Sequence, residues 1–195
     1  MTTECNQKSF AFHHLGRREV IARFDGGNIT SDAGGLLLRE TERVTGIIGQ
    51  FGACFTDHRD PDLIEHPAED LIAQRIYALA LGYEDLNDHD DLRHDPLLAV
   101  LVGKRDPLGR HRSRERDHGK ALAGKSTLNR LELTPVRASS ASRYKKITTD
   151  RRAIQRLFTP TLHKTQLVAG GSLEISRRIA VVCGPATGVG KPHVA

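Results

Sequence analysis

A chain of 195 residues with a net charge of +5 has room for one core, and a core of that size needs neither a metal nor disulfides. Only 38% of the residues are hydrophobic and 5% aromatic, with no Trp, so part of the chain is expected not to pack. The three cysteines form no CxxC pair, which excludes a zinc ribbon and a disulfide framework, and the lack of any run of 18 apolar residues predicts a soluble, cytoplasmic protein.

The N-terminal part of the sequence predicts a strand, a tight turn and a helix. Residues 1–20 are polar and are expected to form a flexible N-terminus. The sequence EVIARF at Glu19–Phe24 then alternates weakly and ends at the turn signal DGGN, which indicates a short strand. Ser31 or Asp32 is expected to cap a helix that Gly46 and Gly49 close.

The middle part contains the strongest helix signals. Pro67 at a first helical position, with two acidic residues behind it, predicts a helix that ends at Gly82. Asn87 is expected to cap a short helix. Asp95, which a proline follows, repeats the signal for a helix over Leu97–Val102.

The last part is less regular. Residues 104–120 are charged and rich in glycine, which predicts a loop. Ser126 is expected to cap a helix over 127–133, and a further helix is expected within 141–158. Residues 159–195 predict an irregular tail, in which RIAVVC could form a strand. The chain is therefore predicted to be mainly α with a short N-terminal strand or hairpin, its helical region covering 21–158.

Charge is divided into two blocks of opposite sign. Between Asp57 and Asp95 there are 12 acidic residues and 3 Lys or Arg, whereas between Lys104 and Arg156 there are 16 Lys or Arg and 5 acidic residues. A basic block of this kind favours nucleic acid as a partner. The alternative is a solvated basic surface that binds no partner.

Alternating arginines in the predicted loop, and the cations that follow, form the candidate DNA contacts. On an extended loop such arginines could straddle a phosphate backbone, and polar side chains on the next helix could reach phosphates or base edges. These candidates are Arg110, Arg112, Arg114, Arg116, Lys120, Lys125, Asn129 and Arg130. The alternative for this helix is a plain core helix that packs through its leucines.

Two further patterns suggest other chemistry. Gly119–Ser126 (GKALAGKS) matches the phosphate-loop pattern and leaves open a small P-loop-like nucleotide-binding protein. That function needs a buried strand before the first glycine, and RHRSRERDH cannot form one. The aspartates of Asp85–Asp95, with His89 and His94, could bind a metal, but helix caps and first-turn charges explain them as well. The sequence therefore assigns no metal ligand and no catalytic residue.

Four stretches resemble one protein family. They are FDGGNITSDAGGLLLRE (Phe24–Glu40), the long FTDHRDPDLIEHPAEDLIAQRIYALALGYEDLNDHDDLRHDP (Phe55–Pro96), LAGKSTLNRLE (Leu122–Glu132) and SRYKKI (Ser142–Ile147). Together they are similar to the N-terminal half of IS1380-type (IS4-like) DDE transposases of insertion sequences, over roughly residues 24–158.

The resemblance implies DNA transposition by an RNase H-like domain. There, three carboxylates hold two Mg²⁺ ions that activate water or a 3′-hydroxyl for cleavage and strand transfer. The first of these carboxylates stands in an LDLDATD-like segment soon after the SRYKKI region. Here Glu174 is the only acidic residue after Phe158, so that domain is expected to be absent or vestigial. The expectation is a truncated, inactive fragment that binds insertion-element DNA and has full-length transposase as a possible partner.

Overall fold

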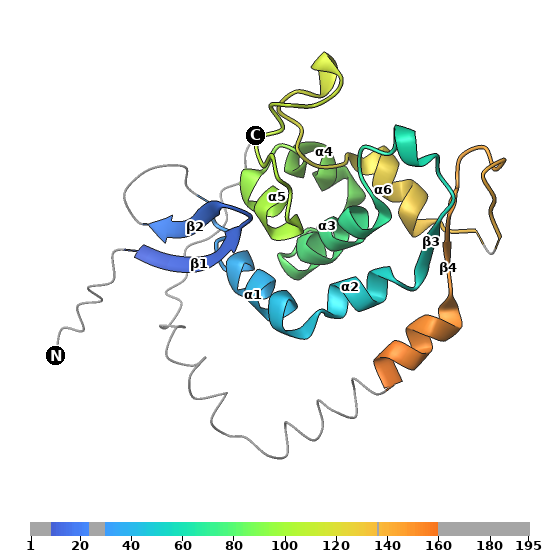
Figure 1. Cartoon of the computed structure of the whole chain (residues 1–195), viewed down its shortest axis with the longest axis horizontal. Coiled ribbons are helices and arrows are strands. Elements are labelled where there is room, and N and C mark those ends of the chain that lie inside the picture. Colours follow the sequence, from blue (N-terminus) through green and yellow to red (C-terminus); the bar gives the residue numbers. More distant parts are fainter. Residues whose placement is uncertain (1–8, 24–29, 136, 160–195) are drawn as a thin grey trace. The chain divides into compact units, whose positions relative to one another are not determined.

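The computed structural model describes residues 9–23, 30–135 and 137–159. The chain divides into two compact units, 1–151 and 152–195. In the second unit, the described residues 152–159 are helical. The elements of the first unit (Figure 1) are β1 (Ser9–Leu15), β2 (Arg18–Arg23), α1 (Gly35–Thr45), α2 (Ile47–Gly52), β3 (Phe55–Asp57), η1 (Pro61–Leu63), α3 (Ala68–Ala80), η2 (Leu86–Asp88), α4 (His89–Leu92), α5 (Pro96–Val102), η3 (Glu115–Asp117), α6 (Lys125–Glu132) and β4 (Ile147–Thr149).

Helices dominate the described residues, as the sequence predicted, and an antiparallel hairpin precedes them. The predicted strand is β2, and its partner β1 lies within residues 1–20, where no strand was expected. Gly16 turns the chain between them with φ +62°. Phe12 and Val20 face each other across the hairpin and pack against the first hydrophobic cluster, so the hairpin is tied to the helices.

Helix α3 lies at the centre of the first unit and packs against α2, α5 and α6. It begins after Pro67 and is followed by Gly82 in a left-handed conformation, as predicted. Leu71 and Ala78 on α3 are fully buried, and each belongs to a different hydrophobic cluster. One cluster joins α3 to α1 and α5, and the other joins it to α6 and β4.

The first predicted cap is wrong. Neither Ser31 nor Asp32 caps α1 through its side chain, because the N-cap residue is Gly34. The Asp32 carboxylate instead accepts a hydrogen bond of 2.7 Å from the Tyr83 hydroxyl. This long-range bond is not visible in the local pattern. The predicted stop at Gly46 is confirmed, with φ +60°, but Gly49 ends no helix, because it lies inside α2.

Two further caps differ by two residues from the prediction. Asp85, not Asn87, is the capping residue of η2, and its carboxylate accepts the Asn87 backbone N–H at 2.9 Å. Helix α6 begins at Lys125 after the N-cap Gly124, so Ser126 lies inside the helix rather than before it. The cap of α5 is confirmed, because Asp95 accepts the Leu97 backbone N–H.

The helix predicted within 141–158 is only partly correct. Its second half is helical, over residues 151–159, but Ile147–Thr149 form strand β4. Strand β4 pairs in antiparallel orientation with β3, which stands about ninety residues earlier in the chain. Each strand has three residues, too few for an alternating pattern to be recognised.

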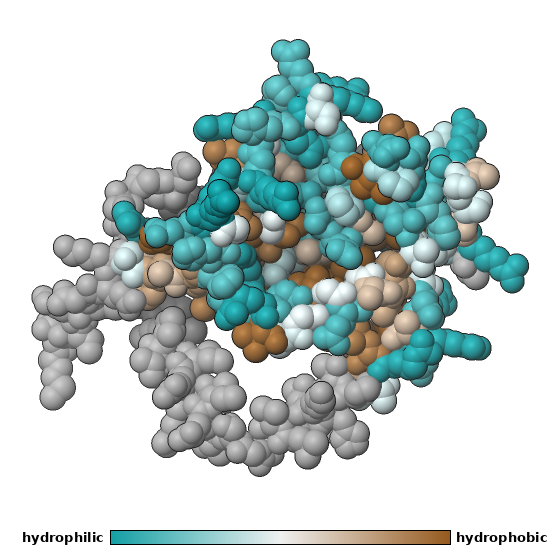
Figure 2. Space-filling view, in the orientation of Figure 1, coloured by the Kyte–Doolittle hydropathy of each residue, from teal (hydrophilic) through white to brown (hydrophobic). Residues whose placement is uncertain are grey.

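Other expectations concern cysteines, membranes and the tail. Cys54 is buried and in no disulfide, whereas Cys5, Cys183 and the RIAVVC stretch lie outside the described residues. Among the described helices, none has the length and apolar character to cross a bilayer. The face shown in Figure 2 is largely hydrophilic, with apolar patches between the polar side chains.

A buried amide joins α3 to the segment before α6. The Gln74 side chain is 1% exposed, and its Nε2 donates to the Ala123 carbonyl at 2.8 Å while its Oε1 accepts the Ala123 N–H at 3.0 Å. The remaining Nε2 hydrogen points at Nδ1 of buried His89, 3.0 Å away. Gln74 therefore satisfies three polar groups that have no access to water.

We expect Gln74→Leu to lower the free energy of unfolding by on the order of 2–3 kcal/mol, because the buried Ala123 backbone groups lose their partner. Urea denaturation followed by circular dichroism measures this change. The matched control is Gln155→Leu, an exposed position that should change stability by less than about 0.5 kcal/mol. Equal midpoints for the two variants would contradict the role of Gln74.

Candidate nucleic-acid interface

Part of the basic block pairs with the acidic block inside the molecule. Three pairs bind a cation of the basic block to a carboxylate of the acidic one, and a fourth runs in the opposite sense. They are Lys104 with Asp70, Arg112 with Glu65, Lys125 with Asp90, and Arg75 with Glu132. The opposite charges of the two blocks are thus partly an intramolecular attraction. Lys104 and Arg112 are 15% and 14% exposed in these pairs, whereas Lys125 keeps 49% of its side chain exposed.

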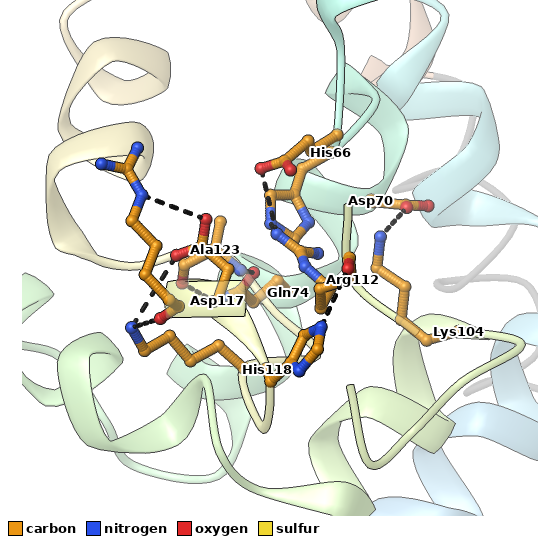
Figure 3. A network of polar contacts seen from close by, with 11 residues as sticks. His66, Asp70, Gln74, Lys104, Arg112, Asp117, His118 and Ala123 are labelled. Atoms are coloured by element: carbon orange, nitrogen blue, oxygen red, sulfur yellow. Dashed lines mark hydrogen bonds and ion pairs between the residues drawn. The ribbon is translucent and has the colours of Figure 1, made fainter. Parts of the chain in front are cut away.

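The Arg112 side chain is directed into the protein, which corrects the expected row of arginines. It is 14% exposed, and its Nη2 lies 3.1 Å from both Glu65 Oε2 and His66 Nε2. Figure 3 shows its guanidinium next to the His66 ring. Because arginine can only donate, His66 Nε2 must accept and His66 Nδ1 carries the hydrogen. Arg112 is therefore held against the acidic block by Glu65 and His66, and little of its side chain is exposed.

The loop over 104–120 is folded back on itself and is not extended. The Gly119 N–H donates to the Gly109 carbonyl at 2.9 Å, which closes the loop at its base. Gly109 has φ +61°, and a Cβ there would lie 2.7 Å from the Ala121 backbone nitrogen, so only glycine fits. Arg110, Arg114 and Arg116 remain exposed on this loop, and Arg116 is 72% exposed.

Two hollows lie next to the first turn of α6, and Ser126 lines both. The first, here called the arginine hollow, has a volume of about 240 Å³ and includes Arg93, Arg112, Arg114, Arg116 and Lys120 in its lining. The second, here called the tyrosine hollow, has about 550 Å³ and is lined by Leu86, Asn87, Lys125, Ser126, Asn129, Arg130, Tyr144 and Lys145. Seven of the eight predicted contacts thus line one hollow or the other, and Arg110 lines neither.

The two hollows differ in charge. Carboxylates of Glu65, Asp90 and Asp117 join the cations of the arginine hollow. The lining of the tyrosine hollow includes three cations and no carboxylate. The positive end of the α6 dipole adds to the field there. Sequence reasoning missed Tyr144 and Lys145, although the basic SRYKKI stretch was a signal that could have pointed to them.

Asp90 occupies the start of α6. Its Oδ1 accepts the Lys125 backbone N–H at 3.2 Å, and its Oδ2 lies 3.3 Å from Lys125 Nζ. The backbone hydrogen bond from Lys125 holds the pKa of the Asp90 carboxyl below its usual value. A carboxylate in this place stabilises the helix N-terminus in the way that an anionic ligand would.

The arrangement does not favour the phosphate-loop alternative. Ala121, Leu122 and Ala123 are buried, and the N–H groups of the last two donate to Arg93 and Gln74. A phosphate would have to displace these acceptors as well as Asp90. The residues before Gly119 form η3 and turns rather than the required strand.

The magnesium implied by the resemblance does not fit the described residues either. In that part of the chain no group of three or more His, Cys, Asp or Glu side chains could hold a metal ion. Asp85 and Asp95 cap η2 and α5, as the explanation of the acidic cluster by helix caps predicted. His94 Nδ1 lies 2.9 Å from the Gly119 carbonyl.

The comparison with known proteins identifies the family. The family model described as "Transposase DDE domain group 1" matches residues 12–165 of this chain. Because the match covers most of the chain, the protein belongs to this family of DDE transposases. No curated protein and no solved structure matches the chain significantly.

Two buried histidines, His66 and His89, make stability depend on pH. Burial lowers the pKa of His89 from 6.5 to about 4. Burial, with the charges of Lys104 and Arg112, lowers the pKa of His66 to about 3. Both rings are therefore neutral in the folded protein, whereas in the unfolded chain they take up protons near pH 6.5. Stability is full above that pH and falls as the pH drops towards the folded-state values.

We expect the free energy of unfolding to fall between about pH 6.5 and 4.5, by up to about 1.4 kcal/mol per pH unit for each of the two histidines. Urea unfolding at a series of pH values measures the slope. His89→Asn should reduce the slope, whereas Gln155→Leu, which removes no titratable group, should leave it unchanged. A flat profile in the parent protein would contradict the neutral buried histidines.

Proposed function

We propose that this chain is a DNA-binding front region of a DDE transposase of the IS1380 type, and that it binds insertion-element DNA around the first turn of α6. The observation that carries the proposal is that Ser126 lines both hollows. The lining of the tyrosine hollow includes three cations and no carboxylate. The family match supports DNA as the partner.

The exposed cations are suited to phosphate contacts. Lys125 is 49% exposed and already donates to Asn87 Oδ1 at 3.2 Å, and Arg130 is exposed one turn later on α6. Arg114, Arg116 and Lys120 supply further charge from the loop. Each phosphate neutralised by such a side chain releases counterions, which favours binding at low salt. Asn129 has an amide that can reach a phosphate or a base edge.

Binding, rather than phosphodiester chemistry, is the activity proposed. The described carboxylates form no metal-binding group, and residues 159–195 contain Glu174 as their only acidic residue. Two-metal cleavage requires several converging acidic ligands. A chain that binds without cleaving would compete with full-length transposase for the same element ends.

We expect the chain to bind duplex DNA with an affinity that falls steeply between about 50 and 200 mM salt. Lys125→Ala and Arg130→Ala should each weaken binding and reduce the slope of log affinity against log salt by about 0.9, because one phosphate contact is lost. Fluorescence anisotropy with a labelled duplex measures both quantities.

The matched control is Arg43→Ala, which removes a half-exposed cation from α1 and should leave the slope unchanged. An equal effect of Arg43→Ala would mean that net charge alone drives binding. Salt-independent binding, or no binding at low salt, would refute the proposal.

We expect no divalent-ion-dependent nicking of supercoiled DNA by the purified chain, because the described residues bring together no acidic ligands for two metal ions. Agarose electrophoresis after incubation with Mg²⁺ or Mn²⁺ measures the conversion to open circles. Nicking that appears with the metal and disappears with a chelator would show that the chain carries a working active site.

A further inference from the structure

Tyr144 differs from the other tyrosines of the chain. Its side chain is 60% exposed, whereas Tyr77 is buried and Tyr83 is half-buried with its hydroxyl bonded to Asp32. The Arg143 guanidinium carbon lies 5.0 Å from the Tyr144 ring centroid, a distance at which a cation is attracted to the ring face. Tyr144 also lines the tyrosine hollow.

The groups around Tyr144 match the parts of a nucleotide. Lys125, Arg130 and Lys145 are cations for a phosphate, and Leu86 gives apolar surface. Asn87 and Asn129 carry amides that can hydrogen-bond a base edge. The volume of about 550 Å³ lies in the range of pockets that bind small molecules, which is the size class of a single nucleotide.

A second basic hollow also borders the ring. Tyr144 and Arg130 line this smaller hollow of about 50 Å³ together with Lys146 and with Arg59, whose guanidinium is paired with Asp57. Cations therefore line both hollows that Tyr144 borders. An aromatic ring flanked by cations is the arrangement in which proteins bind single-stranded nucleic acid, because bases stack on the ring while phosphates meet the cations.

We propose that the tyrosine hollow binds an unpaired nucleotide of DNA, with the base stacked on Tyr144 and the flanking phosphates near Arg130 and Lys145. Base faces are covered in an intact duplex, so the hollow selects single-stranded or locally opened DNA. The inference rests on the proposed DNA-binding function and names the form of DNA that this part of the surface takes. Stacking is sequence-tolerant, and one base is expected to contribute roughly 5- to 100-fold in affinity.

The chain offers a direct spectroscopic test because it contains no Trp. In a Tyr144→Trp variant the new indole is the only tryptophan, and its fluorescence reports contact with a base. We expect oligo(dT) to quench this emission strongly, and a fully paired duplex of equal length to quench it weakly. Equal quenching by both, or none by oligo(dT), would overturn the inference.

Affinities measured by anisotropy complete the test. Tyr144→Ala should weaken oligo(dT) binding by roughly 5- to 100-fold and duplex binding by less than about twofold. Tyr144→Phe should retain binding because it keeps the ring, and Leu63→Ala, at another exposed apolar side chain, should have no effect.

The outcomes separate the two proposals. Loss of single-strand affinity with duplex affinity kept supports the inference. Parent-like oligo(dT) binding by Tyr144→Ala, or an equal loss of affinity for both forms of DNA, overturns the inference. In either case, duplex binding by the parent chain still supports the proposed function. If the parent chain binds neither form, the proposed function and this inference both fail.

Discussion

The pair of hydrogen bonds between the Gln74 amide and the Ala123 backbone fixes the surface around α6. Gln74 lies on the central helix α3, and Ala123 stands directly before Gly124, where α6 begins. An amide in an apolar interior costs free energy unless all its hydrogen bonds are made, so Gln74 tolerates only one placement of the segment. That placement fixes the positions of Lys125 and Ser126, and Ser126 lines both hollows. The buried amide is thus the physical origin of the surface that we assign to DNA.

Charged side chains have two roles in this fold: some pair with each other inside the molecule, and others remain exposed to a partner. The sequence shows how many cations there are, but not which role each one has. The excess of cations after Lys104 indicated a polyanionic partner, but the structure commits Lys104 and Arg112 to carboxylates of the acidic block. Lys125 is shared, because its ammonium lies 3.3 Å from Asp90 and yet is half-exposed. A solvent-exposed ion pair of this kind contributes only about 0–1 kcal/mol, so a DNA phosphate can compete for the lysine. Arg112, largely buried against Glu65, has no such freedom.

The elements that could be predicted are those whose signals are local. Pro67 and Asp95 mark the starts of α3 and α5 through contacts within a few residues, so their helices were found. Strand β4 and the role of Gln74 depend on partners 49 or more residues away, which no local pattern records. The same limit applies to the site. Residue type alone suggested Arg112. The basic SRYKKI stretch was a signal for Tyr144, but it could not show that the ring is exposed, because exposure is decided by tertiary packing.

The acidic block is best understood as a scaffold for the basic surface. Asp85 and Asp95 are occupied by backbone N–H groups at helix starts, and Asp70 and Asp90 by lysines. A metal site built from these carboxylates would have to give up caps worth about 1 kcal/mol each and release the lysines that they hold. The same side chains cannot both position the cations and gather around a divalent ion. Within the described residues, the carboxylates of the acidic block therefore act as caps and as partners of cations, which is the arrangement that supports the proposed binding surface.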